Sequence, residues 1–77
     1  MDFEVAGMTI GTVGTDGDDR AIEFAVRAPG AQEGARFAIH RDHDQGWEAA
    51  RLTIDPRSDG VPVAAVEWAV EFAREYL

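Results

Sequence analysis

The segment from Val61 to Leu77 constrains the fold most, because it is the one long stretch whose apolar residues repeat with the period of an α-helix. Its charged residues fall on a single arc of the helical projection, and nearly all other positions are apolar; the charged residues are Glu67, Glu71, Arg74 and Glu75. A helix that covers one sheet needs an apolar stripe only a little over about 100° wide, and this stripe is roughly twice as wide.

Two interpretations of this wide apolar surface remain open. In the first, the helix lies deep in a concave sheet, and its alanines allow a close approach to the strands. In the second, one flank of the helix, which carries Trp68 and Phe72 one turn apart, meets another protein chain. Pro62 suits the first helical turn, where its missing N–H needs no partner. Ser58 or Asp59 is expected to cap the start of the helix.

Before this helix, runs of alternating apolar and polar residues predict antiparallel strands over residues 2–13, 20–27, 36–41 and 47–55. The first run changes parity at Gly7, which indicates either a β-bulge within one long strand or a tight turn at Ala6-Gly7. We favour the bulge, because each half of the run is very short on its own.

The apolar positions of these strands define the inward face of the sheet and include Ile22, Phe24, Val26, Phe37, Ile39, Leu52 and Ile54. Because every connection is short, consecutive strands are expected to pair with each other. The predicted fold is therefore a single α+β domain over residues 1–77 with two layers. A four-stranded antiparallel meander, five-stranded if Gly7 lies in a turn, is covered on one face by the C-terminal helix.

The composition is strongly acidic, with a formal net charge of −8 over 77 residues and with arginine as the only basic residue apart from two histidines. This charge disfavours direct nucleic-acid binding, because phosphate contacts need a basic surface. The absence of cysteine excludes disulfides and thiolate metal sites. With no membrane-length apolar run and no signal peptide, we expect a cytoplasmic protein that does not bind membranes. The acidity itself has three open explanations: GC-rich coding, adaptation to high salt, or a basic partner.

Topology gathers the acidic turns at one edge of the predicted sheet. Alternate turns of a meander share an edge, so the turns over 14–19 and 42–46 should lie together, and the helix should end beside them. That edge would hold Asp16, Asp18, Asp19, Asp42, Asp44 and Glu75, next to the negative end of the helix dipole. We expect a docking site for a basic partner or a divalent cation; the alternative is that turns simply favour aspartate.

The remaining motifs carry little chemical specificity. His40, Asp42, His43 and Asp44 are metal-ligand types, but a zinc site needs three or four converging ligands. Neither acidic turn has the spacing of a calcium loop, and the glycines do not form a phosphate-binding loop. We therefore expect neither enzymatic activity nor a cofactor, and retain a weak divalent-cation site in the 42–44 turn as an alternative.

The sequence thus favours a small acidic protein-interaction module, of the accessory, inhibitor, immunity or phage-encoded kind, which binds a basic protein surface. The first alternative is a stand-alone structural or housekeeping domain of a high-salt or GC-rich organism that forms a homodimer through the helix flank. The residues expected to bind a partner are Asp16, Asp18, Asp19, Asp42, His43, Asp44, Trp47, Trp68, Phe72 and Glu75.

Overall fold

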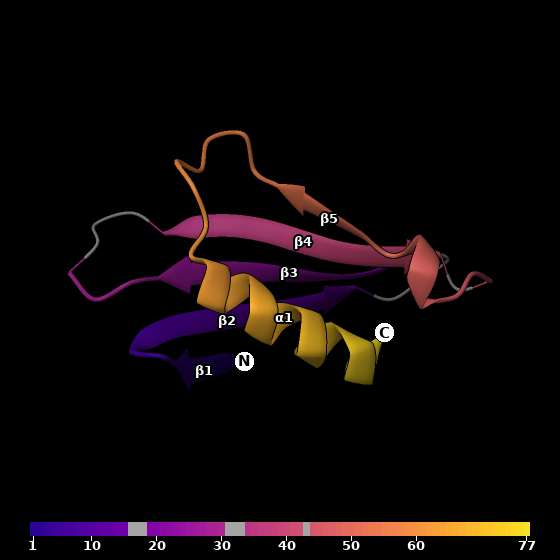
Figure 1. The fold of residues 1–77 in the computed structure, drawn as a ribbon, viewed down its shortest axis with the longest axis horizontal. Coiled ribbons are helices and arrows are strands. Elements are labelled where there is room, and N and C mark those ends of the chain that lie inside the picture. Colours follow the sequence, from indigo (N-terminus) through magenta and orange to yellow (C-terminus); the bar gives the residue numbers. More distant parts are fainter. Residues whose placement is uncertain (16–18, 31–33, 43) are drawn as a thin grey trace.

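A computed structural model describes residues 1–15, 19–30, 34–42 and 44–77 of the chain. Five strands form one antiparallel sheet in the order β1-β2-β3-β4-β5, and a single helix lies across one face of it (Figure 1). The elements are β1 (Asp2–Val5), β2 (Met8–Thr15), β3 (Asp19–Arg27), β4 (Ala35–Asp42), the 3₁₀ turn η1 (Trp47–Ala49), β5 (Arg51–Ile54) and α1 (Val63–Tyr76). The predicted α+β meander with one C-terminal helix is confirmed.

The segment around Gly7 is a turn, so the bulge that we favoured is wrong. Ala6 and Gly7 both have positive φ angles, of 51° and 81°, and Val5 pairs directly with Met8 across them. This two-residue connection has the backbone of the hairpin turns whose twist matches that of the strands. The turn reverses the chain, and this reversal explains the change of parity: Phe3 and Val5 lie on the same face as Met8 and Ile10.

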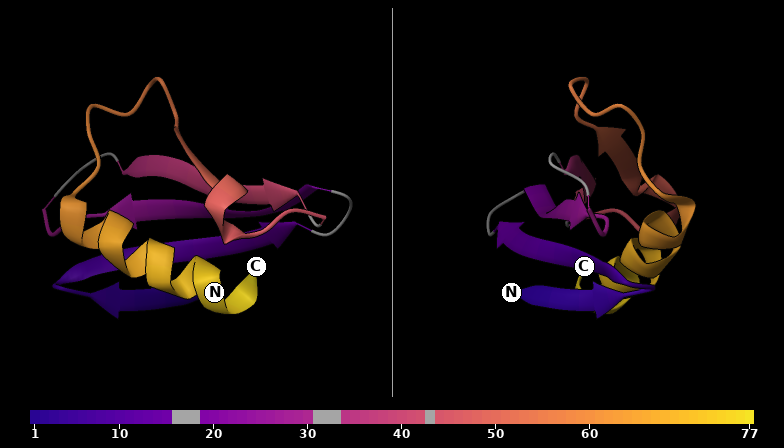
Figure 2. Two further views of the ribbon diagram at one scale, coloured as in Figure 1. Left: turned by 45° about the vertical axis from the view of Figure 1, so that its right-hand side comes forward. Right: turned by 90° about the vertical axis from the view of Figure 1, so that its left-hand side faces the viewer.

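The core lies between the sheet and an alanine seam on α1. Ala65, Ala69 and Ala73 recur at every fourth position and are fully buried. They lie over the buried side chains of the first four strands, which include Met8, Ile10, Ile22, Phe24, Val26, Phe37 and Ile39. Small side chains on this face let the helix approach the sheet closely, as the first interpretation of the helix predicts. The helix occupies one side of the sheet only (Figure 2).

The prediction for the last strand is partly wrong. Residues 47–49 form a 3₁₀ turn, and β5 begins only at Arg51. Leu52 and Ile54 pair with Ile39 and Phe37 and therefore lie on the helix side of the sheet, but they are 38 % and 48 % exposed. The reason is that α1 packs mainly against β1, β3 and β4. Five strands span roughly 19 Å, whereas a helix is only about 10–12 Å across, so one edge remains uncovered.

The connection from β5 to α1 is fastened to β4. The Ser58 hydroxyl accepts a hydrogen bond from the Arg36 N–H at 2.9 Å and donates one to the Arg36 carbonyl at 3.4 Å. Ser58 therefore does not cap the helix, and the structure shows no side-chain cap; the Pro62 carbonyl instead accepts from the N–H groups of Ala65 and Val66. In the part of the chain that the structure describes, no helix is long and apolar enough to cross a membrane.

Candidate protein-interaction site

The predicted convergence of acidic segments is present in the backbone. Asp19 and Asp42 lie opposite each other in the β3–β4 register, so the β2–β3 and β4–β5 connections leave the sheet at the same end. α1 also ends there (Figure 1). We call this region the acidic end and define it by the backbone of Asp19, the exposed residues Asp42, Asp44, Glu48 and Glu75, and Leu77. Asp16, Asp18 and His43 lie outside the described residues.

Two arginines supply countercharge within the acidic end. The Arg41 guanidinium donates hydrogen bonds to the backbone oxygens of Gln45 and Leu77, and so joins the β4–β5 connection to the last turn of α1. The Arg74 guanidinium lies 5.4 Å from the centre of the Trp47 ring, within the range of a cation–π contact. A cation at a helix C-terminus also opposes the negative end of the helix dipole. These two arginines therefore offset part of the negative charge at this end.

The helix flank with Trp68 and Phe72 lies against β1. The Phe3 ring is 5.1 Å from the Trp68 ring and 5.3 Å from the Phe72 ring, measured between centroids, and Trp68 and Phe72 stack on each other at 5.0 Å. Both residues are half-buried. Their outer edges remain available to a partner, whereas their inner faces belong to the core. Tyr76 continues this aromatic row at 4.6 Å from Phe72 and is largely exposed.

His40 follows the buried Ile39 in β4 and therefore lies on the face of the sheet away from the helix. Its Nε2 atom is 3.1 Å from the Thr53 hydroxyl oxygen on β5. Among the described residues, no group of three or more His, Asp or Glu side chains is placed to hold a metal ion. The described part of the 42–44 turn therefore gives the divalent-cation alternative no support.

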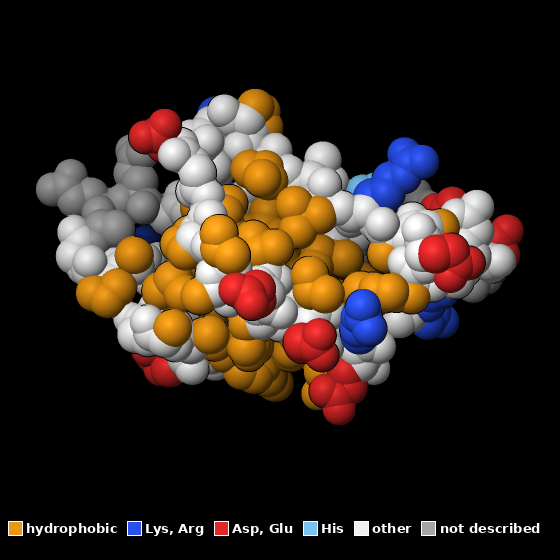
Figure 3. Space-filling model, viewed as in Figure 1, with side chains coloured by type: hydrophobic (Ala, Val, Ile, Leu, Met, Phe, Trp, Pro, Cys, Tyr) orange, Lys and Arg blue, Asp and Glu red, His pale blue; other side chains and the backbone are white. Residues whose placement is uncertain are grey.

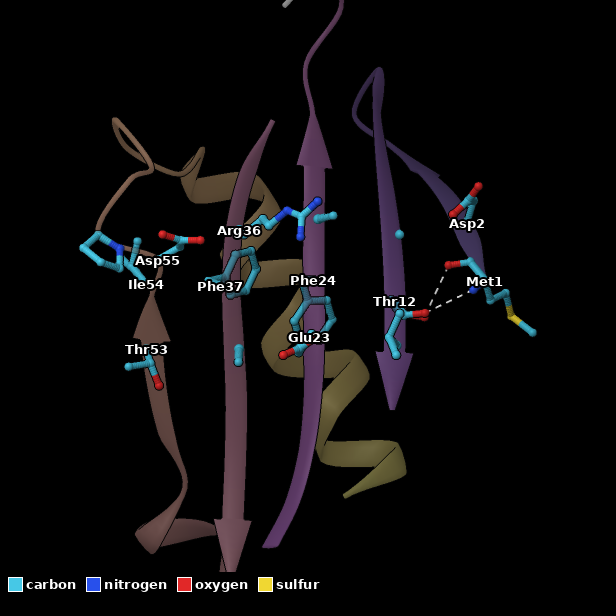
Figure 4. A pocket seen from close by; sticks show the side chains of 15 residues that line it. Met1, Asp2, Thr12, Glu23, Phe24, Arg36, Phe37, Thr53, Ile54 and Asp55 are labelled. Atoms are coloured by element: carbon cyan, nitrogen blue, oxygen red, sulfur yellow. Dashed lines mark hydrogen bonds between the residues drawn. The ribbon is translucent and has the colours of Figure 1, made fainter. Parts of the chain in front are cut away.

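The open face of the sheet contains a shallow trough of about 540 Å³ (Figure 4). Its middle is lined by small residues, because Gly11, Ala25 and Ala38 occupy successive strands, and Glu23 and Arg36 project beside them. Its lining among the described residues includes no histidine, cysteine or serine.

Asp55 lies at the β5 side of this trough and is held by the turn that follows it. The Arg57 backbone N–H donates to the Asp55 carboxylate at 2.9 Å, and the Arg57 side chain lies 3.5 Å from both of its oxygens. The hydrogen bond from the Arg57 backbone N–H, followed by the bond from the Arg57 side chain, lowers the pKa of Asp55 below its ordinary value.

Sequence reasoning missed two features of the candidate partner surfaces: the hydrogen bond from Arg41 to the end of α1, and the open edge of β5 with Leu52 and Ile54. The second follows from the misassigned turn at Gly7. Recognising Ala6-Gly7 as a hairpin would have given a fifth strand, and one helix cannot cover five strands. Comparison of the chain with protein-family models, with curated proteins and with solved structures finds no match.

Proposed function

We propose that this chain is a small, non-enzymatic protein-interaction module whose acidic end binds a basic protein surface. The observation that supports the proposal is the meeting of three chain segments at one end of the molecule: the β2–β3 connection, the β4–β5 connection and the end of α1. Acidic side chains lie at this end and along the outer side of the helix, and basic side chains lie among them (Figure 3).

The side-chain contacts within this end favour specific docking over a diffuse charge effect. Arg41 ties the β4–β5 connection to the last turn of the helix, and Trp47 is packed against the core beside Arg74. Acidic groups held on a fixed frame lose little conformational freedom when a basic partner binds. Trp47, Phe72 and Tyr76 offer aromatic surface close to these charges, and aromatic residues are enriched in the energetic centres of interfaces.

A charge-matched pair of variants tests the proposal. The double variant Asp42→Asn/Asp44→Asn removes two charges from the acidic end, and Glu67→Gln/Glu71→Gln removes two from the exposed middle of the helix. The probe is an arginine-rich peptide of about ten residues, titrated into ¹⁵N-labelled protein at low salt. We expect shifts of amide signals at the acidic end, and an affinity at least about fivefold weaker for the first variant but within about twofold for the second.

Equal weakening by both variants would show that only the overall charge attracts the peptide, and would overturn the proposal. Shifts concentrated on the open face of the sheet, around Glu23, would do the same.

A further inference from the structure

The edge of β5 is the one apolar edge of the sheet. Leu52 and Ile54 point to the helix side but lie beyond the reach of α1, which leaves both substantially exposed. Figure 3 shows a broad apolar area beside α1, where β5 runs in Figure 1. Exposed, apolar edge strands readily pair with another strand, so most proteins protect them.

The backbone N–H and C=O groups of the same two residues are also oriented for such pairing. The Asp55 N–H donates to the Arg36 carbonyl at 2.9 Å, which makes Asp55 a residue bonded to β4. Hydrogen-bonding direction alternates along a strand, so Arg51 and Thr53 also face β4. The N–H and C=O groups of Leu52 and Ile54 therefore face away from the sheet, toward the open edge.

We infer that a second copy of this chain pairs antiparallel with β5, so that the two sheets join into one around a twofold axis at Thr53. In this register, Leu52 of each copy exchanges both backbone hydrogen bonds with Ile54 of the other. The apolar side chains of both copies then lie on the same face, between the two helices. Arg51 of each copy pairs across the interface with Asp55 of the other. These side chains lie on the face of the sheet away from the helices, and the pair is of the non-hydrogen-bonded type, in which the side chains are closer together.

Charge and backbone chemistry select this register over its neighbours. Shifting the axis to Leu52 places Arg51 opposite Thr53 and leaves Asp55 without a basic neighbour across the interface. Shifting it to Ile54 places Pro56, which has no N–H, opposite Leu52 at a bonding position. Only the axis at Thr53 forms complete hydrogen-bonded pairs together with two opposite-charge pairs, which is the self-complementarity that a twofold interface requires.

The other edge of the sheet does not offer the same pairing. Met1 and Thr12 exchange backbone hydrogen bonds of 3.1 and 2.8 Å, so the alternation turns the backbones of Asp2 and Glu4 outward. Pairing β1 with a second β1 would oppose these carboxylates. Pairing β1 of one copy with β5 of another would place the Asp2 and Glu4 carboxylates beside Leu52 and Ile54, on an apolar face. The acidic β1 edge therefore prevents open-ended polymers, and the association closes at two copies.

The first test measures molar mass by light scattering during size-exclusion chromatography, over a wide range of protein concentrations. We expect a mass of twice the 8.4 kDa chain at high concentration. Leu52→Lys should give a monomer. The matched control Val13→Lys, at a 61 % exposed position on the interior strand β2, should remain a dimer. Arg51→Glu should weaken the dimer at least about fivefold, and added salt should partly restore it.

The second test follows hydrogen exchange of single amides by NMR. Because the Leu52 and Ile54 amides have no partner within the sheet, they should exchange quickly in dilute protein and become protected as concentration rises. The Thr53 amide, which faces β4, should be protected throughout. A chain that stays monomeric, or a dimer that survives Leu52→Lys and leaves both amides exchanging quickly, overturns the inference. Circular dichroism verifies that each variant is folded. None of these outcomes depends on the acidic end.

Discussion

At the scale of single residues, the distance between helix and sheet is set by three alanines. Ala65, Ala69 and Ala73 have no exposed surface, and the aromatic and aliphatic side chains beneath them belong to the strands. This row of small side chains was predictable from the sequence, because the alanines recur with helical spacing inside the apolar stripe. Their burial also means that no room exists for a larger side chain at these positions.

Enlarging the seam should therefore destabilise the fold. We expect Ala69→Leu to lower the free energy of unfolding by about 1–3 kcal/mol, because the added atoms must push the helix away from the sheet. Ala64→Leu, at an exposed position on the same helix, should change it by no more than about 0.5 kcal/mol. Urea unfolding followed by tryptophan fluorescence measures both. Equal effects would mean that the seam is not closely packed.

Asp55 should make stability depend on pH. Its folded-state pKa is lowered, first by the Arg57 backbone N–H and then by the Arg57 side chain, so the ionised carboxylate stabilises the folded chain. That stabilisation is complete above the ordinary pKa of 3.8 and disappears as the pH falls through the lower folded-state value. Asp55→Asn should therefore be less stable than the natural chain at neutral pH and equally stable in strong acid. Urea midpoints across the pH range measure this.

Arg57→Gln separates the two sources of the Asp55 shift. It keeps the backbone N–H that donates to the carboxylate and removes only the side-chain contribution. Its pH-dependent loss of stability should be smaller than that of Asp55→Asn. A difference between the natural chain and Asp55→Asn that is constant with pH would show that the carboxylate contributes no linked stability.

At the scale of elements, the order of strands and the position of the helix were predictable, whereas two boundaries were not. The alternation in β3 and β4 is regular, and their inward residues are buried as expected. The turn at Ala6-Gly7 was missed because alanine is rare at a positive φ, which costs an L-residue roughly 1–2 kcal/mol. The 3₁₀ turn at 47–49 was missed because Trp47 favours strands by propensity but is held by Arg74 and the core.

The unfavourable positive φ of Ala6 makes the β1–β2 hairpin easy to stabilise. Asn tolerates a positive φ far better than alanine, and Asn-Gly is the preferred pair for this turn. We expect Ala6→Asn to raise the free energy of unfolding by about 0.5–1 kcal/mol, and Gly7→Ala to lower it by about 1 kcal/mol or more. Gly14→Ala, where φ is not positive and the added carbon meets nothing within 4 Å, should be nearly neutral or slightly stabilising. Thermal and urea unfolding measure all three.

At the scale of the whole molecule, the candidate site was partly predictable, because connection lengths alone place the acidic turns and the helix end together. The hydrogen bond from Arg41 to Leu77 was not, because a long side chain on β4 reaches Leu77 only in the folded molecule. The net charge of −8 belongs to the molecule as a whole and not to the acidic end alone. Such an excess opposes the compact state by self-repulsion, and salt screens it.

Stability should consequently rise with salt at neutral pH. We expect the melting temperature to increase when sodium chloride is raised from about 10 mM to about 150 mM, over which the screening length falls from roughly 30 Å to 8 Å. Near pH 4.4, where the net charge vanishes, the increase should disappear. Scanning calorimetry measures both. A further large increase at molar salt would favour adaptation to a saline cell interior as the origin of the acidity.

The simple up-and-down order of the strands also bears on how the molecule forms. Every strand bonds only to its neighbours in sequence, so the sheet can assemble from successive hairpins without distant encounters, which favours rapid folding. The helix follows all five strands along the chain. During synthesis on a ribosome, the apolar face of the sheet therefore emerges before the helix that covers it, and it stays uncovered until residues 63–76 have left the exit tunnel.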